Sequence, residues 1–325
     1  MIVRNIPQPV LFGSLAVAVL SVFSLSLFCG GIGCWFMTVD DQGLWDLRLS
    51  RTIAAVVSGA LLSLSGALLQ LLLRNPLADP YTLGVSGGAA VGALLTRFVP
   101  ALGLVAVSLQ MGAILGALFS TLLLFVIAKR RLLAAPSLHE PAGIGLILTG
   151  VMIASGFGAI TSLILALSPD TELRGALFWL MGDLDVEGGD RWVGIILVLI
   201  GGWAVWNAPK LNLLAHGEAT AHLLGLCVPR LRLQVLLFAS IATAAAVSVA
   251  GAIGFIGLVV PHICRLVLGN DQKRLLPASM LLGAAALVLS DLLARTVVAP
   301  IQLPVGVVTA LIGVPVFLLI LVRRR

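Results

Sequence analysis

Long apolar runs, each close to the length of a bilayer crossing, constrain this chain more than any other feature. Of its 325 residues, 60% are hydrophobic and only 10% are charged. A soluble domain carries roughly a quarter of its residues as charges. We therefore expect an all-α polytopic membrane protein that forms a single transmembrane domain over residues 1–325.

The apolar runs between charges and prolines predict about ten transmembrane helices, because a span needs about 20 apolar residues. The first run follows Arg4, as a signal peptide would, but it is too long for an h-region and no clear A-x-A cleavage site follows. We interpret it as a retained span. The predicted spans are approximately 10–29, 52–73, 82–97, 104–128, 143–167, 191–207, 232–253, 255–269, 277–296 and 305–322.

Basic residues predict the orientation of these spans. With a cytoplasmic N-terminus, fourteen of the 20 Lys and Arg residues fall inside, and the six outside are Arg48, Arg51, Arg97, Arg174, Arg191 and Arg295. Cytoplasmic loops of membrane proteins carry such an excess of positive charge. We therefore expect both termini in the cytoplasm. The net charge of +6 follows from this topology, so nucleic-acid binding is not needed to explain it.

A polar hinge, RNPLADPYTLGVSGGAA at 74–90, separates the second and third predicted spans. A proline lacks a backbone donor and biases the preceding residue away from helix, so the second span must end here. The predicted topology puts this hinge at the cytoplasmic end, where it would shape an inner mouth or border a partner. Its most distinctive residues are Arg74, Asn75, Pro76, Asp79 and Pro80.

The four cysteines carry little information. Cys29 and Cys34 lie at the outer end of the first span, where a disulfide could form in an oxidising compartment, but we favour ordinary apolar thiols. Cys227 and Cys264 lie near the inner face. No Cys/His spacing suggests a metal site, and we expect this chain to bind no metal or cofactor.

The lysines argue against ATP hydrolysis by this chain. A phosphate-binding G-x-x-x-x-G-K-[ST] loop needs a lysine after a glycine. The only lysines are Lys129, Lys210 and Lys273, and none of them follows a glycine. A transport role would therefore need energy from elsewhere.

Two other membrane functions are possible in principle. An ion-coupled secondary transporter usually buries ionisable groups at mid-membrane. Here Asp291 and Arg295, one helical turn apart near the outer end of the ninth span, suit a local ion pair as well as proton coupling. An intramembrane serine protease is suggested by G-x-S-G at 84–87, but no histidine of this chain has an asparagine four residues on, as the rhomboid helix requires.

The hinge resembles the signature of permease subunits in ABC importers for iron chelates, haem and cobalamin. Further segments resemble that family in the same order, and together they cover most of 47–322. They are LRLSRTIAAVVSGALLSLSGALLQ at 47–70, FWLMGDLD at 178–185, GAIGFIGLVVPHICR at 251–265, LLPASMLLGAAALVLSDLLAR at 275–295 and LPVGVVTALIGVPVFLLIL at 303–321.

This resemblance implies a type II ABC importer permease fold in the inner membrane of a bacterium. It implies a homodimer with a translocation path along the dimer axis. Two ATP-binding subunits, which carry ATP and magnesium, would dock inside, and a periplasmic substrate-binding protein would deliver the substrate outside. The expected cargo is an iron complex, either a ferric siderophore or haem, with cobalamin as the alternative.

The resemblance also assigns a cytoplasmic coupling segment to LLAHGEATAHLLG at 213–225. A bend at Gly217 and an acidic Glu218 in the first turn of a helix suit this role, because the helix dipole favours an anion there. A short interfacial helix without a partner is the competing interpretation. The expected ATPase-contacting residues are Leu213, Leu214, His216, Gly217, Glu218, Leu223, Leu224 and Gly225.

Outside, Arg48, Arg51 and Arg295 match positions where the family presents arginines to glutamates of the binding protein. Snorkelling at helix ends competes with that role. The fifth span resembles the helix that lines the path, although its small residues would also suit close helix packing. The expected path residues are Thr149, Gly150, Ser155, Gly158, Thr161 and Ser162.

A weak internal repeat agrees with a transporter, because inverted repeats place the substrate path at their interface. A shift of 185 residues aligns Ser63, Gly66, Ala67, Pro76, Leu83 and Gly84 with Ser248, Gly251, Ala252, Pro261, Leu268 and Gly269.

Overall fold

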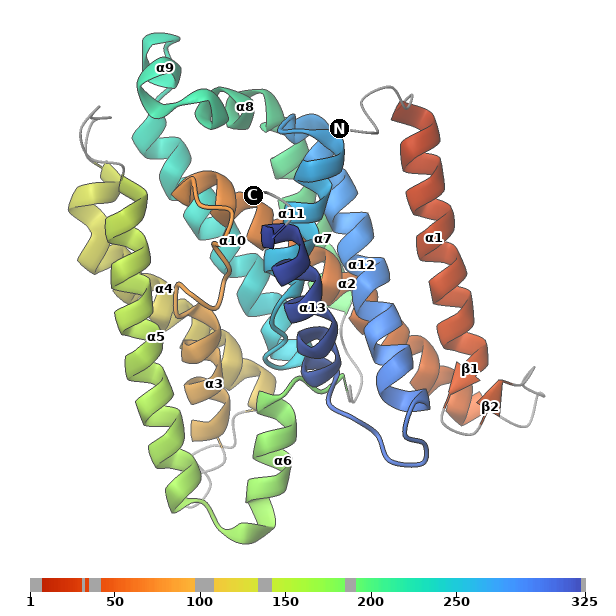
Figure 1. Cartoon of the computed structure of the whole chain (residues 1–325). Coiled ribbons are helices and arrows are strands. Elements are labelled where there is room, and N and C mark those ends of the chain that lie inside the picture. Colours follow the sequence, from red (N-terminus) through yellow and green to blue (C-terminus); the bar gives the residue numbers. More distant parts are fainter. Residues whose placement is uncertain are drawn as a thin grey trace.

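The computed structural model describes residues 8–30, 33–34, 42–96, 108–133, 142–184 and 191–322. These residues form a helical bundle with one small β-pair (Figure 1). The elements are α1 (Gln8–Phe28), β1 (Cys29–Gly30), β2 (Gly33–Cys34), α2 (Gln42–Leu73), α3 (Val85–Leu95), α4 (Leu109–Leu133), α5 (Ala142–Leu167), α6 (Asp170–Leu180), α7 (Arg191–Trp206), α8 (Ala208–His216), α9 (Glu218–Leu223), α10 (Val228–Ala250), α11 (Ile256–Leu268), α12 (Gln272–Thr296) and α13 (Val305–Val322).

The apolar helices overlap the predicted spans one for one. Among the described residues, α1, α2, α4, α5, α10 and α12 are long and apolar enough to cross a membrane. The α7 helix reaches that length together with α8, from which it is bent by 59°, and α3, α11 and α13 are shorter apolar helices. The start predicted for the fourth span, at 104, lies outside the described residues.

Two helices begin well before the predicted spans. The α2 helix begins at Gln42 and α12 at Gln272, where Asp271 accepts a hydrogen bond from the backbone of Lys273 as an N-cap. Hydropathy detects only the apolar part of such helices, whereas the backbone continues into polar turns. For the same reason the short helix α6, which opens with Asp170 and Glu172, has no counterpart among the predicted spans.

The bundle has two distinct ends. In Figure 1, α8 and α9 lie at the top, and α1 begins and α13 ends toward this side. The α6 helix and the β-pair lie at the opposite end. We call these the α8–α9 end and the α6 end.

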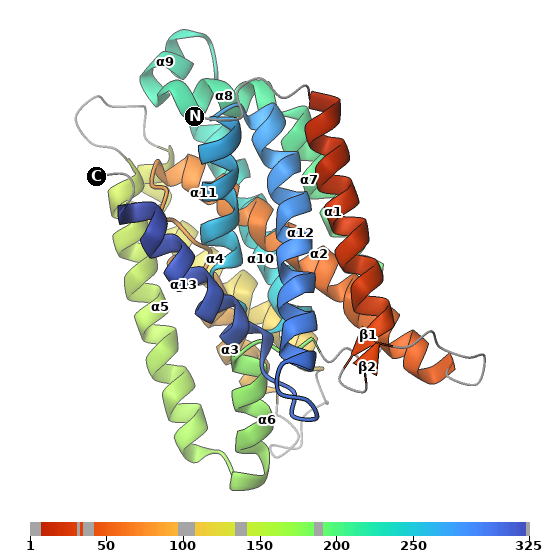
Figure 2. The same cartoon turned by 45° about the vertical axis from the view of Figure 1, so that its right-hand side comes forward.

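The α2 helix forms the centre of the bundle (Figures 1 and 2). Almost all of its apolar stretch is buried, and it packs against α10, α11 and α12. A Cβ added at Gly59 would lie 2.4 Å from the backbone oxygen of Gly283, and one at Gly66 would collide with the backbone of Gly257. Small residues thus let neighbouring backbones approach closely, as is typical of membrane helices.

A pair of G-x-x-x-G sequences joins α3 to α4. Gly88 and Gly92 of α3 face Gly116 and Gly112 of α4, and a Cβ at Gly92 would lie 2.1 Å from the carbonyl oxygen of Gly112. The short α3 is therefore held by backbone contact along its length.

The hinge between α2 and α3 runs from the α8–α9 end into the bundle. Arg74 ends α2 with a φ of 49°, and Gly84 begins α3 with a φ of 79°. Gly84 packs against Ile153 and Ala154, near the middle of α5. Non-helical backbone at such a depth requires protein around it and internal hydrogen bonds. Tight turns supply these bonds, including one from the Thr82 backbone to the carbonyl of Asp79.

The two helix pairs α2–α3 and α10–α11 run in opposite directions, as expected for an inverted repeat (Figure 1). The alignment by 185 residues does not hold residue by residue, however. Gly66 lies within α2, whereas Gly251 caps the end of α10. Pro76 lies in the hinge, whereas Pro261 lies inside α11.

We expected Cys29 to be an ordinary apolar thiol, but the structure shows that it is disulfide-bonded. The antiparallel β-pair places Cys29 directly opposite Cys34. The first span was predicted to end at about residue 29, and α1 ends at Phe28, directly before β1. Cys227 and Cys264 are free thiols.

We expect Gly92→Ala to lower the free energy of unfolding by about 1–3 kcal/mol, because overpacking a tight contact costs that much. Chemical denaturation in detergent micelles measures it. Gly158→Ala is the matched control, since a Cβ at Gly158 meets nothing within 4 Å. Equal stabilities of the two variants would contradict the packing argument.

Candidate functional site

The expected coupling segment projects from the bundle as two short helices. Gly217, with a φ of 132°, separates α8 from α9. Leu223 is 86% exposed and Leu224 is 63% exposed, whereas Leu214 is buried. Leu223 and Leu224 therefore offer an apolar surface to a partner, whereas Leu213 is half-buried and Leu214 packs inward.

An ion pair ties α9 to α10. The Arg232 Nε donates to Glu218 Oε1 at 3.0 Å, and a second guanidinium nitrogen contacts the other carboxylate oxygen. Arg232 is only 2% exposed. Such bidentate pairs fix the relative orientation of two elements. Glu218, expected to favour the helix dipole and to contact the ATPase, thus also holds α9 to a membrane helix.

A second link ties α8 to α12. The Asn212 Nδ2 donates to Asp271 Oδ1 at 2.7 Å, and Asn212 Oδ1 accepts from the backbone of Gln272 at 2.7 Å. The hydrogen bond from Asn212 holds the pKa of the Asp271 carboxyl below its usual value. Sequence reasoning missed Asn212, because its partners are about sixty residues away and no local pattern marks it.

At the α6 end, a buried aspartate binds two of the three expected docking arginines. Asp291 is fully buried, with Arg51 Nε at 2.8 Å from one carboxylate oxygen and Arg295 Nη2 at 2.9 Å from the other. Arg295 also donates to Ser26 Oγ at 2.7 Å. Arg48 donates to the backbone carbonyl of Leu27 at 3.1 Å. The Asp291–Arg295 pair was expected, but the pairing of Arg51 was not.

This arrangement favours a structural role for Asp291 over proton coupling. The carboxylate lies near the end of α12, not at mid-span, and two guanidiniums compensate its charge. Two arginines contact this one aspartate, so the cluster of Arg51, Asp291 and Arg295 carries a net positive charge.

The expected path residues lie on different faces of α5. Gly150 is buried against Leu83 of the hinge, so it serves helix packing. Ser155, Gly158 and Ser162 are exposed along one stripe, whereas Thr161 is half-buried. The two serine hydroxyls donate to carbonyls of their own helix. This stripe is therefore small and weakly polar.

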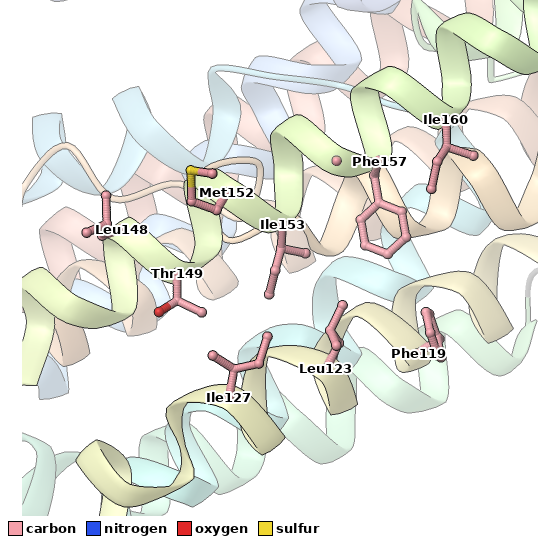
Figure 3. Close-up of a pocket in the computed structure, with 10 residues that line it drawn as sticks. Phe119, Leu123, Ile127, Leu148, Thr149, Met152, Ile153, Phe157 and Ile160 are labelled. Carbon is pink, nitrogen blue, oxygen red and sulfur yellow. The ribbon is translucent and has the colours of Figure 1, made fainter.

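Thr149 lies instead in a groove between α4 and α5 (Figure 3). The groove has a volume of about 610 Å³, and its walls are apolar, with Phe119 and Leu123 on α4 facing Ile153 and Phe157 on α5. Thr149 donates its hydroxyl hydrogen to the carbonyl of Gly145. Such a surface suits contact with apolar groups.

The family segment FWLMGDLD connects three elements near the α6 end. The backbone of Ala252, in the break between α10 and α11, donates to the carbonyl of Trp179 at 3.4 Å. The backbones of Val305 and Gly306, at the start of α13, donate to Gly182 and Met181 at 3.0 Å each. The end of α6 is thus hydrogen-bonded to both the α10–α11 break and α13.

A multi-pass bundle with a broken helix pair, a deep non-helical hinge and a projecting helical segment has features typical of membrane transporters. Comparison with known proteins agrees. The FecCD transport family matches residues 9–323, and the chain belongs to that family.

Several relatives are similar over nearly the whole chain. The uncharacterized ABC transporter permease protein YvrB of Bacillus subtilis is 43% identical over 324 residues, covering 95% of this chain and 86% of the relative. The vitamin B12 import system permease protein BtuC of Vibrio cholerae is 39% identical, covering 96% of this chain and 92% of BtuC. A solved structure described as an inward-facing metal-chelate type ABC transporter has a TM-score of 0.83 at 30% identity, covering 97% of this chain and 99% of that one.

The chain is therefore an ABC importer permease of the FecCD and BtuC type, with a type II importer permease fold. Permeases of this family are transport components, and ATP hydrolysis belongs to separate ATPase partners.

We expect Asp291→Asn to destabilise the protein by about 3–5 kcal/mol, because it leaves two largely buried guanidiniums without their carboxylate. Thermal unfolding in detergent measures the change. Asp46→Asn, which makes the same change at an exposed position of α2, serves as the control. If both variants unfold at the wild-type temperature, Asp291 is not the structural centre of this cluster.

Proposed function

We propose that this chain forms the translocation path of an ATP-driven importer and receives the movement of its ATPase through α8 and α9. The observation that carries this proposal is the double attachment of that segment, to α10 through Glu218 and to α12 through Asn212. The exposed Leu223 and Leu224 supply apolar contact to the ATPase. ATP and magnesium are bound by two copies of that partner.

The hydrogen bonds of the bundle support a route for alternating access. A displacement of α9 moves α10, and the break at the end of α10 is bonded to the end of α6. The end of α6 is bonded in turn to α13. A movement begun at the α8–α9 end thus reaches helices at the opposite end, and the path switches between inward and outward facing. No covalent bond is made or broken by this chain.

We further propose a homodimer whose path runs between the two copies, along the stripe of Ser155, Gly158 and Ser162 on α5. The exposed faces of α1 and α5 support this assignment. The α1 helix exposes large apolar residues such as Val17 and Leu20, which suit lipid. The α5 helix also exposes large apolar residues such as Met152 and Leu163, but beside them it presents the small, weakly polar stripe. Such a stripe suits a large cargo that must pass without being held tightly.

The orientation follows from charge. Arg74, Arg232 and Arg265 lie toward the α8–α9 end, so we assign this end and both termini to the cytoplasm of a bacterium, with the protein in its inner membrane. The α6 end then faces the periplasmic binding protein. The net positive charge of the Asp291 cluster supports docking of acidic residues. We expect this docking chiefly through Arg48, because its partner in the contact with Leu27 is a backbone carbonyl and not a carboxylate.

For the cargo we propose cobalamin. Two relatives support it, BtuC of Vibrio cholerae at 39% identity and the cobalamin import permease BtuC of Halobacterium salinarum at 43% identity over 86% of this chain. The iron complexes expected from the sequence, ferric siderophore or haem, are the alternative, and the metal-chelate type structural neighbour fits either cargo.

Uptake by a strain lacking this subunit tests the proposal. We expect labelled cobalamin uptake to fall to background and to return with the intact gene, while siderophore and haem uptake stay unchanged. Loss of siderophore or haem uptake alone would move the cargo to an iron complex. Unchanged uptake of all three would contradict the importer assignment for these cargoes.

A further inference from the structure

A cationic pocket opens at the α8–α9 end, between the end of α2, the end of α8 and the end of α11. Its volume is about 430 Å³. Arg74, Arg265, His216 and His262 line it together with the amides of Gln70 and Asn270. Among the described residues that line the pocket, none is an aspartate or a glutamate. The pocket therefore offers donors and positive charge to an anion.

The pocket is built rather than incidental. Gln70 Oε1 accepts from Arg265 Nη1 at 2.8 Å, and Asn270 Oδ1 accepts from Arg265 Nε at 3.2 Å. Gln70 is itself buried, and its Nε2 donates to the carbonyl of Leu258 at 3.0 Å. Two neutral amides thus hold the guanidinium in place. Donors fixed in this way bind an anion without a large cost in side-chain ordering.

The pocket also adjoins the coupling segment. A Cβ at Gly217 would lie 3.2 Å from Arg74 Nη2, so this guanidinium rests against the junction of α8 and α9. The acidic residue of that junction is Glu218, and its carboxylate is paired with Arg232. His216, the last residue of α8, contacts the carbonyl of Asn212 through Nδ1 at 2.7 Å, which orients its ring at the pocket wall.

We infer that this pocket receives an acidic side chain of the partner ATPase. The inference rests on the proposed function and adds a second contact to the exposed leucines of α9. Leu223 and Leu224 provide apolar area, and the pocket provides one charge-assisted contact beside them. Two contacts of different chemistry define the orientation of the ATPase, which one apolar contact does not, because charge complementarity fixes register more than affinity.

Assembly of the purified permease with its ATPase in nanodiscs, measured over a range of salt concentrations, tests this inference. We expect Arg74→Glu to weaken assembly by roughly tenfold or more and to flatten its salt dependence. Arg74→Lys, which keeps the charge, should stay within a few-fold of wild type. Arg230→Glu is the matched control, because Arg230 is an exposed arginine at the start of α10 that does not line the pocket.

The outcomes are separable. If the wild-type protein does not bind the ATPase and Leu223→Asp changes nothing, the proposed function fails. If the wild type binds and Leu223→Asp weakens binding, but Arg74→Glu equals Arg230→Glu, the ATPase contact at the pocket is refuted. Unchanged ATPase binding by Arg74→Glu, with loss of co-purified phosphatidylglycerol, would assign the pocket to lipid instead. Monodisperse elution of each variant confirms that it is folded.

Discussion

The attachment of α8 and α9 to two membrane helices is the constraint on which the functional account depends. A surface helix of six residues has little stability of its own, since isolated short helices are marginal in water. Here the bidentate pair of Glu218 with the buried Arg232 orients α9, and Asn212 holds α8 to the capped start of α12. Because both links end in membrane helices, a force on the leucines of α9 is passed into the bundle.

Close packing makes the rest of this arrangement possible. The contacts of Gly92 with Gly112 and of Gly59 with Gly283 bring helices together at backbone distance. The resulting wall encloses the hinge, whose non-helical backbone lies deep among the helices and is hydrogen-bonded within tight turns. At the opposite end Asp291 of α12 joins α2 through Arg51, and Arg295 of α12 joins α1 through Ser26. The bundle is thus tied at both ends, while the deep hinge and the α10–α11 break interrupt its helices.

Apolar runs and prolines were sufficient to predict which segments form apolar helices and in which order, because both act locally along the chain. The family resemblance was confirmed by comparison with known proteins. Long-range partners could not be predicted in the same way. Nothing local to Arg51 indicates Asp291, which is 240 residues away, and nothing local to Asn212 indicates Asp271. Similarly, the pattern of leucines in 213–225 did not separate the buried Leu214 from the exposed Leu223.

The most direct test of the central claim is to replace the Glu218–Arg232 link with a cleavable one. Glu218→Cys and Arg232→Cys are introduced together, with Cys227 and Cys264 changed to alanine, and a short bifunctional thiol reagent joins them. Substrate uptake driven by ATP is measured in proteoliposomes with the ATPase partner. The account predicts low uptake before cross-linking, recovery after it, and loss again when the linker is cleaved. If the cross-link abolishes uptake that the uncross-linked protein supports, α9 must move against α10, and the account is wrong.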